Sequence, residues 1–230
     1  MKIAIMGAMP EEIEPILKKL GKYKAVEYAK NTYYEANYKG VDVVLAYSKI
    51  GKVFSTLTAV SMIEHFGATK LLFSGVAGAI SPELKVGDLI VATKLSQHDL
   101  DITAFGHPHG FVPEGQVFVE ADKELIEIAH KVSKESGKKI KEGSIATGDQ
   151  FIACSDKKDW ICRTFGTDAL EMEGGSVAVV CDALNVPFFI LRAISDAADM
   201  DASFSFDEFL ETSAVESADF IMKMVDEIVS

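Results

Sequence analysis

The sequence contains few cysteines and no long apolar run, and each shortage excludes a class of protein. The three cysteines, Cys154, Cys162 and Cys181, are odd in number and show no C-x-x-C spacing. They indicate free thiols in a reducing compartment rather than a disulfide framework or a zinc site. No run approaches the roughly 18 apolar residues of a membrane span, and the short apolar start leads at once into Pro10-Glu11-Glu12, unlike a signal peptide. We therefore expect a cytoplasmic protein without a membrane partner.

Positive charge is also scarce, which restricts the partners. The 230 residues carry 23 Lys and Arg against 35 Asp and Glu, a net charge of −12, whereas binding to nucleic acid needs a basic face. Only two arginines occur, Arg163 and Arg192. The sequence has neither a Walker A motif nor G-x-G-x-x-G. We expect no nucleic-acid partner and no nucleotide site of either kind.

Strand and helix patterns alternate along the whole chain, with no linker, repeat or low-complexity segment. Hydrophobic residues make up 48% and charged residues 25%, typical of a globular protein with a substantial core. The apolar segment Pro187–Ile194 predicts a central strand covered on both faces. The alternation predicts one α/β domain over residues 1–230, a three-layer α-β-α sandwich around a twisted mixed sheet.

Further strands are predicted at Lys2–Met6, Asn31–Tyr38, Val41–Tyr47, Lys70–Ser74, Asp88–Ala92, Gly143–Thr147 and Ala169–Met172. Helices are predicted at Pro10–Leu20, Val53–Phe66, Glu120–Ser136, Ser155–Phe165, Ser176–Leu184 and Phe206–Val229.

Several carboxylates follow apolar strands, where α/β proteins build ligand sites. Glu171 and Glu173 come at the end of a short strand, and Asp196 ends the buried strand that contains Arg192. Glu12 lies just past the first strand, where the dipole of the following helix explains an acid equally well. Burying a charged side chain at the end of a strand costs free energy unless the charge is paired or takes part in the function of the protein. These residues are therefore active-site candidates.

The residues alone leave three alternatives open. Gly75-Val76-Ala77-Gly78 is either a tight turn that needs small residues or a place where a flat ligand approaches the backbone. Glu171 and Glu173 share one face if their strand stays regular, whereas a twist at Gly174-Gly175 would separate them. Asp196 either caps a turn or faces a ligand.

Seven motifs occur in order along the chain: MGAMPEE at the start, SKIGKV at 48–53, SGVAG at 74–78, GDQFI at 148–152, EMEG at 171–174, RAISDAAD at 192–199 and FSFDEF at 204–209. Together they resemble the motifs of the 5′-methylthioadenosine/S-adenosylhomocysteine nucleosidases, which belong to the nucleoside phosphorylase superfamily. The resemblance covers essentially the whole chain. YSKIGKV, SQHDLD and HPHGFVPE also resemble the branch that hydrolyses 6-amino-6-deoxyfutalosine.

The resemblance implies hydrolysis of an N-ribosyl adenine bond through an oxocarbenium-like sugar cation. Asp196 would protonate adenine as the general acid, oriented by Ser195. Glu12 would position and deprotonate the attacking water. Glu173 would accept hydrogen bonds from the ribose hydroxyls, and Arg192 would hold those hydroxyls or Glu173 in place.

The resemblance also implies a set of substrate-binding residues and a homodimer. The ring of Phe151 would stack on adenine, the backbone of this segment would bond its edge, and Gly78 would allow close approach. The residues matching this base site and the sites of the sugar and its apolar 5′ tail are Phe151, Ile152, Met172, Met9, Ile50 and Phe206. Phe105 and Pro113 match a loop that in this family comes from a second subunit. No cofactor and no metal are implied, and His98, beside an aspartate, is expected to form structural hydrogen bonds.

Two other functions would suit the same scaffold. A phosphorylase would use phosphate as its nucleophile and would need a cationic anion site. The loop after the first strand instead carries Glu11 and Glu12, which repel phosphate but suit a water. A non-catalytic nucleoside sensor would be expected to lack the acid or the base. The hydrolase is the preferred interpretation.

Overall fold

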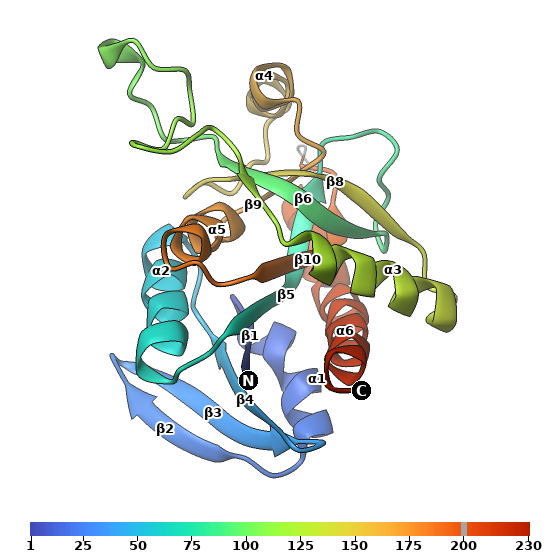
Figure 1. Ribbon diagram of the computed structural model, residues 1–230. Helices are drawn as coiled ribbons and strands as arrows, with labels where there is room; N and C mark the ends of the chain where they lie inside the picture. The colour runs from blue at the N-terminus through green and yellow to red at the C-terminus, as the bar shows by residue number, and fades with distance from the viewer. Residues whose placement is uncertain (199–201) are drawn as a thin grey trace.

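The computed structural model describes residues 1–198 and 202–230, in which helices cover both faces of a mixed sheet (Figure 1). Helices α2 (Lys52–Val60) and α5 (Gly174–Ala183) cover one face. Helices α1 (Pro10–Leu20), α3 (Lys123–Ser136) and α6 (Ala202–Val229) cover the other. The three-layer α-β-α arrangement is confirmed. Asp199, in the RAISDAAD motif, lies outside the described residues.

Ten strands form the sheet within the described residues. They are β1 (Lys2–Gly7), β2 (Lys24–Tyr28), β3 (Asn31–Tyr38), β4 (Val41–Tyr47), β5 (Lys70–Ala79), β6 (Leu89–Gln97), β7 (Val119–Glu120), β8 (Ile140–Thr147), β9 (Ala169–Glu171) and β10 (Phe188–Asp196). Strands β4, β1, β5 and β10 run parallel, and β6, β8 and β9 run in the opposite direction. Because β10 pairs with both β5 and β6, the strands β10-β6-β8-β9-β5 close into a ring.

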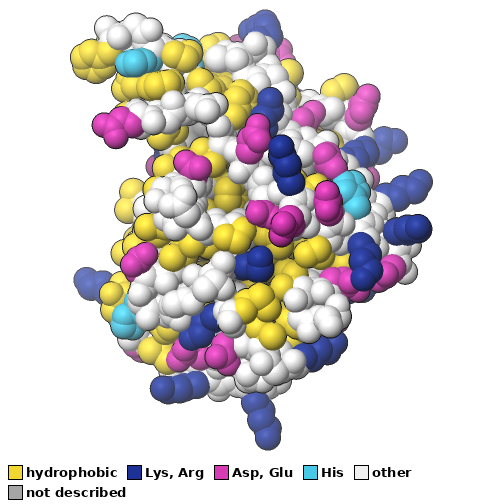
Figure 2. Space-filling model, viewed as in Figure 1, with side chains coloured by type: hydrophobic (Ala, Val, Ile, Leu, Met, Phe, Trp, Pro, Cys, Tyr) yellow, Lys and Arg dark blue, Asp and Glu magenta, His cyan; other side chains and the backbone are white. Residues whose placement is uncertain are grey.

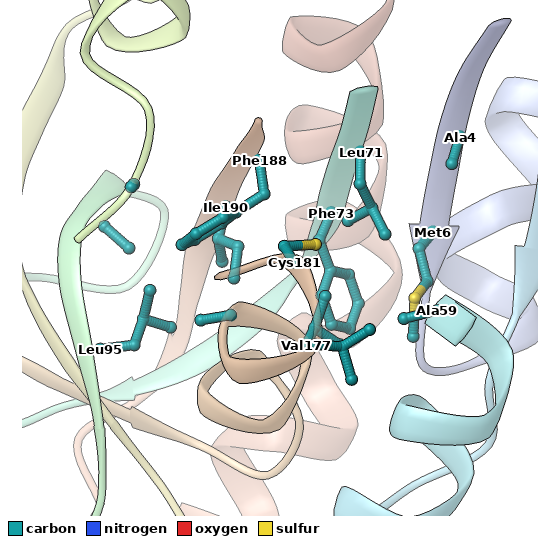
Figure 3. Close-up of a cluster of buried hydrophobic side chains, with 14 of the residues drawn as sticks. Ala4, Met6, Ala59, Leu71, Phe73, Leu95, Val177, Cys181, Phe188 and Ile190 are labelled. Atoms are coloured by element: carbon teal, nitrogen blue, oxygen red, sulfur yellow. The ribbon is translucent and has the colours of Figure 1, made fainter. Parts of the chain in front are cut away.

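Two large hydrophobic clusters hold the helices to the sheet. In the first, Val177 and Cys181 of α5 lie beside Phe73 of β5 (Figure 3). The second contains Ile16 of α1 and Phe220 of α6 on the opposite face. All three cysteines are free thiols, and burial raises the pKa of Cys181 to about 12. The apolar periodicity that predicts these helices is thus explained by two separate layers of packing.

Several predicted elements differ from those observed. The sequence pattern misses β2, because only Val26 in this strand is even partly buried and no apolar face marks it. The helix predicted at Val53–Phe66 is α2 followed by a π-helical turn at Ser61–His65. Strand β6 runs five residues beyond the predicted Ala92, to Gln97, where it pairs with β8. No helix in the described ranges is both long and apolar enough to cross a bilayer.

The packing of α6 yields a stability prediction. Phe220 is fully buried in the second cluster, whereas Val215 on the same helix is 39% exposed. Replacing Phe220 with alanine should lower the free energy of unfolding by about 3–5 kcal/mol, because it removes apolar contacts and leaves a cavity. Val215→Ala should change it by about 0.5 kcal/mol or less. Urea titrations of both variants test this, and equal losses would show that α6 is not anchored at Phe220.

Candidate active site

A cavity of about 270 Å³ lies where β1, β5 and β10 reach their carboxyl ends. Its other walls come from the segments that follow β4, β8 and β9 and from the start of α6. Of the residues expected at the site, those that line this cavity are Met9, Glu12, Ile50, Gly78, Phe151, Ile152, Met172, Glu173, Ser195, Asp196 and Phe206. The fold therefore gathers residues from most of the chain's length into one place.

The glycine segment 75–78 is part of strand β5, so the tight-turn interpretation is wrong. Gly78 pairs with Leu170 of β9 on one side and with Asp196 of β10 on the other. A Cβ atom at Gly78 would lie 2.6 Å from Oδ1 of Asp196, and one at Gly75 would lie 2.9 Å from Oε1 of Glu12. Both glycines are needed because carboxylates occupy the space beside the strand.

Glu12 is held by backbone amides from two elements. Its Oε2 accepts hydrogen bonds from the amides of Ala8 at 2.5 Å and Met9 at 3.1 Å, and its Oε1 accepts one from Val76 at 3.2 Å. Burial raises the pKa of Glu12, although the charge of Arg192 and these amides oppose the effect. Glu12 thus caps its helix and also faces the cavity, so the two explanations of its position hold together.

The carboxylate that Arg192 contacts is Glu171, whereas the resemblance implied that Arg192 would hold the ribose hydroxyls or Glu173. Nη2 of Arg192 lies 2.8 Å from Oε2 of Glu171, and the guanidinium carbon stacks 4.0 Å from the centre of the Phe73 ring. The hydroxyl of Thr147 donates to Oε1 of Glu171. Arg192 is 1% exposed and is not among the described residues that line the cavity. Its positive charge therefore offsets the negative charge of the site carboxylates although its side chain does not line the cavity.

Glu171 and Glu173 have separate roles because β9 ends between them. Glu171 is the last residue of β9, and Glu173 is the N-cap of α5, so the chain turns before the Gly174-Gly175 pair. Oε1 of Glu173 accepts a hydrogen bond from the Gly51 amide at 2.8 Å. Burial and the nearby charge of Glu171 raise the pKa of Glu173. Both acids line the cavity, but Glu171 is paired with Arg192, whereas Glu173 is held by the Gly51 amide.

Asp196 is oriented by donors at both carboxyl oxygens. The Ser195 hydroxyl donates to Oδ2 at 2.9 Å, and the Ala198 amide donates to Oδ1 at 2.8 Å. Ala198 has a φ of +50°, a left-handed conformation that costs a non-glycine residue energy. Asp196 thus both caps a turn and faces the cavity, and the turn fixes its direction.

The rest of the cavity is apolar. Phe151 and Phe206 meet edge to face, with ring centres 5.7 Å apart, and Met9, Ile50 and Met172 add further apolar surface. The cavity lining therefore combines carboxylates with apolar side chains, a combination suited to a small amphipathic ligand. Among residues 1–198 and 202–230, no group of three or more metal-ligating side chains is spaced to hold an ion.

Phe105 and Pro113 lie outside the cavity of their own chain. They belong to the segment between β6 and β7, which projects from the body of the protein at the upper left of Figure 1. Phe105 is 81% exposed, and Figure 2 shows hydrophobic side chains gathered on this projecting segment.

Several residues that support the site through their backbone or a single hydroxyl could not be identified from the sequence. The amides of Ala8, Gly51 and Val76 and the hydroxyl of Thr147 all bind site carboxylates. The motifs MGAMPEE, SKIGKV and SGVAG contain the three amide donors, but a backbone donor has no side-chain signature. Only the fold reveals these contacts.

Comparison with known proteins gives consistent matches over the full chain. The family described as the phosphorylase superfamily matches residues 2–230. An aminodeoxyfutalosine nucleosidase from Campylobacter jejuni is 59% identical, over 99% of this chain and 100% of the relative. A 5′-methylthioadenosine/S-adenosylhomocysteine nucleosidase from Haemophilus influenzae is 36% identical, over 99% and 100%. The structure of a futalosine hydrolase from Helicobacter pylori has a TM-score of 0.97 at 49% identity, covering 98% of this chain and 97% of that one.

The raised pKa of Glu173 predicts a dependence of stability on pH. A carboxyl whose pKa is higher in the folded state than its ordinary value of 4.5 binds its proton more tightly when folded. The contribution of Glu173 to the free energy of unfolding is therefore complete at low pH. It is lost as the pH rises from 4.5 through the raised pKa. Glu173→Gln, which mimics the protonated acid, should remove this loss, which is worth about 1.4 kcal/mol for each pH unit of the shift.

The measurement is the free energy of unfolding at pH 6 and pH 8.5 for the wild type, Glu173→Gln and Glu14→Gln. Glu14 is exposed on α1, so its variant should follow the wild type. A Glu173→Gln protein that loses as much stability as the wild type over this range would contradict the raised pKa.

Proposed function

The chain belongs to the phosphorylase superfamily, and we propose that within it this protein is a nucleosidase that releases adenine by hydrolysis. The proposed substrates are 5′-methylthioadenosine, S-adenosylhomocysteine and 6-amino-6-deoxyfutalosine. The observation that supports it most is that Glu12, Glu173 and Asp196 line one cavity together with apolar side chains, among them Met9, Phe151 and Phe206. The names of the relatives from Campylobacter jejuni and Haemophilus influenzae support the same substrates.

Asp196 is proposed as the general acid. Adenine leaves more easily when its imidazole ring takes up a proton, and the carboxyl that donates it must face the base. Asp196 lines the cavity and is held by Ser195 and the turn at Ala198. As the bond from the ribose to the base nitrogen breaks, its electron pair stays with adenine, which receives the proton of Asp196.

Glu12 and Glu173 are proposed to serve the sugar cation that remains. Glu173 would accept hydrogen bonds from the ribose hydroxyls, which fixes the sugar ring in place. Glu12 would take a proton from the water that attacks the anomeric carbon. The burial that raises the pKa of Glu12 makes it a better proton acceptor. After one turnover Glu12 holds a proton and Asp196 has lost one, so exchange with solvent restores both.

The charge distribution favours water over phosphate as the nucleophile. None of the described residues that line the cavity is Lys, Arg or His. The guanidinium of Arg192 pairs with Glu171 beneath the site, and Arg163 is exposed on α4 (Ser155–Phe165). A phosphate beside Glu12 would meet carboxylates without a cation from these residues to balance it. Hydrolysis is therefore preferred over phosphorolysis.

A homodimer is proposed from the surface around the cavity. Ile50, which lines the cavity just before α2, is 53% exposed, and Val53 and Leu57 on α2 are 75% and 43% exposed. Phe105 is exposed on its own projecting segment. Such apolar surface is usually covered by a partner, and a second copy would bring Phe105 and Pro113 to the cavity. Free thiols at all three cysteines support a cytoplasmic location.

The general acid and base are tested by Asp196→Asn and Glu12→Gln. Each should lower the rate of adenine release from 5′-methylthioadenosine by about 10²–10⁴-fold, because each removes one proton transfer. Thermal unfolding should show that both variants are folded. Glu14→Gln, on the exposed side of the helix that carries Glu12, should keep full activity. Turnover near the wild-type rate in either site variant would overturn its assigned role.

The dimer is tested by Phe105→Ala. We expect KM to rise about tenfold for nucleosides with apolar 5′ tails and kcat to stay nearly unchanged, because about 1.4 kcal/mol of tail binding is lost. Sedimentation of the wild type should give twice the monomer mass. A monomeric wild type, or a variant with an unchanged KM, would contradict the shared cavity.

A further inference from the structure

Three polar side chains hold the start of the segment 148–152, which carries Phe151 and Ile152 into the cavity. Nζ of Lys52 donates to Oδ1 of Asp99 at 2.6 Å, and the amide of Asp149 donates to Oδ2 of Asp99 at 2.8 Å. Oδ1 of Asp149 in turn accepts a hydrogen bond from the amide of Lys52 at 2.7 Å. The contacts form a closed ring that joins the start of α2, the end of β6 and the segment after β8. We call Lys52, Asp99 and Asp149 the loop clamp.

The clamp also completes α2. The N-cap of α2 is Gly51, which has no side chain to cap the helix and has a φ of +100°. The carboxylate of Asp149 takes the place of a capping side chain, at the end of the helix that favours negative charge. A Cβ atom at position 51 would lie 3.0 Å from Oδ1 of Asp149. Both the conformation and the space therefore require glycine at this point.

The pair at the centre of the clamp is partly shielded and charged. The side chains of Lys52 and Asp99 are 19% and 17% exposed. Burial alone would raise the pKa of Asp99, but hydrogen bonds from Lys52 and from the Asp149 amide outweigh it and lower the pKa. The ion pair is therefore complete at neutral pH and is less screened than one on the open surface.

His98 packs against the first residue of the segment, Gly148, without joining the clamp. A Cβ atom at Gly148 would lie 2.3 Å from the His98 ring. The ring was expected to form structural hydrogen bonds, but its nitrogens have no partner in the described part of the chain. Burial lowers the pKa of His98 to about 4, so the ring is neutral and does not compete with Lys52 for Asp99.

The same start of α2 contacts the ribose end of the site. The Gly51 amide binds Glu173 at 2.8 Å, and Ile50 lines the cavity. The peptide units at 51 and 52 thus contact Glu173 on one side and Asp149 on the other. A shift of the segment 148–152 relative to α2 would change the distance between the base site and the ribose site.

We propose that Lys52 and Asp99 are positioning residues that hold the base-binding segment in register with Glu173. Neither lines the cavity among the described residues, so both act through Asp149 and not through contact with the substrate. The inference rests on the proposed nucleosidase function. It adds to that function a pair of side chains outside the acid, base and ribose groups.

The test compares Lys52→Met, Asp99→Asn, the double variant and Lys52→Arg with the wild type. Either single variant should raise KM and the Kd of free adenine about tenfold, the effect of losing one charge-assisted hydrogen bond. The factor should be the same for 5′-methylthioadenosine and S-adenosylhomocysteine, because the clamp acts on the base and not on the tail. The double variant should be no worse than the poorer single variant, since the two residues form one unit. Lys52→Arg should restore most of the binding.

The matched control is Lys131→Met, which removes the ion pair of Lys131 with Glu227 on the surface formed by α3 and α6. Its KM and adenine Kd should equal those of the wild type. Two results would overturn the clamp but leave the proposed function intact, provided that the wild type is active. One is that Lys52→Met has the same KM and adenine Kd as the wild type. The other is that the losses of binding free energy in the two single variants add up in the double variant. A wild type that releases no adenine would overturn the proposed function as well.

Discussion

One buried guanidinium has to balance the carboxylates that meet at the ends of the strands. Arg192 pairs with Glu171, stacks on Phe73 and opposes the rise in the pKa of Glu12 and Glu173. Without that charge, these acids could not be buried together, because an unpaired buried charge costs several kcal/mol. Arg192 is the only buried Lys or Arg in the described part of the chain, and burial still raises the pKa of Glu12 and Glu173. The packing of the sheet itself therefore supplies the raised pKa that the proposed proton transfer to Glu12 would use.

The ring of strands explains how the acids reach one another. Gly78 of β5 pairs with Leu170 and Asp196, so residues about 90 and 120 positions further along the chain arrive on either side of it. The glycines of β5 leave the space into which Glu12 and Asp196 extend. The clamp of Lys52, Asp99 and Asp149 joins segment 148–152 to the start of α2 and the end of β6. Rigid strands thus position the acids, and the polar clamp positions the segment that we propose to bind the base.

The sequence predicts the elements whose signals are local. Periodicity and flanking residues predict the bounds of α1 and α4 and the apolar strand that ends at Asp196. The motifs predict Glu12, Glu173 and Asp196 as site residues. The partner of Arg192 and the strand conformation of segment 75–78 do not follow, because both depend on pairing between distant parts of the chain. A glycine beside a strand looks like a turn until the carboxylate that needs its space is known. Backbone donors such as Gly51 leave no signal in a single sequence.

Phosphate dependence tests the central claim most directly, since the described cavity lining contains acids and no cation. Adenine and sugar products should be followed by chromatography with 5′-methylthioadenosine, S-adenosylhomocysteine and 6-amino-6-deoxyfutalosine, each with and without phosphate. We expect adenine and a free sugar to form at the same rate under both conditions. Release that requires phosphate and yields a sugar phosphate would contradict it, and would assign Glu12 a role other than activating water.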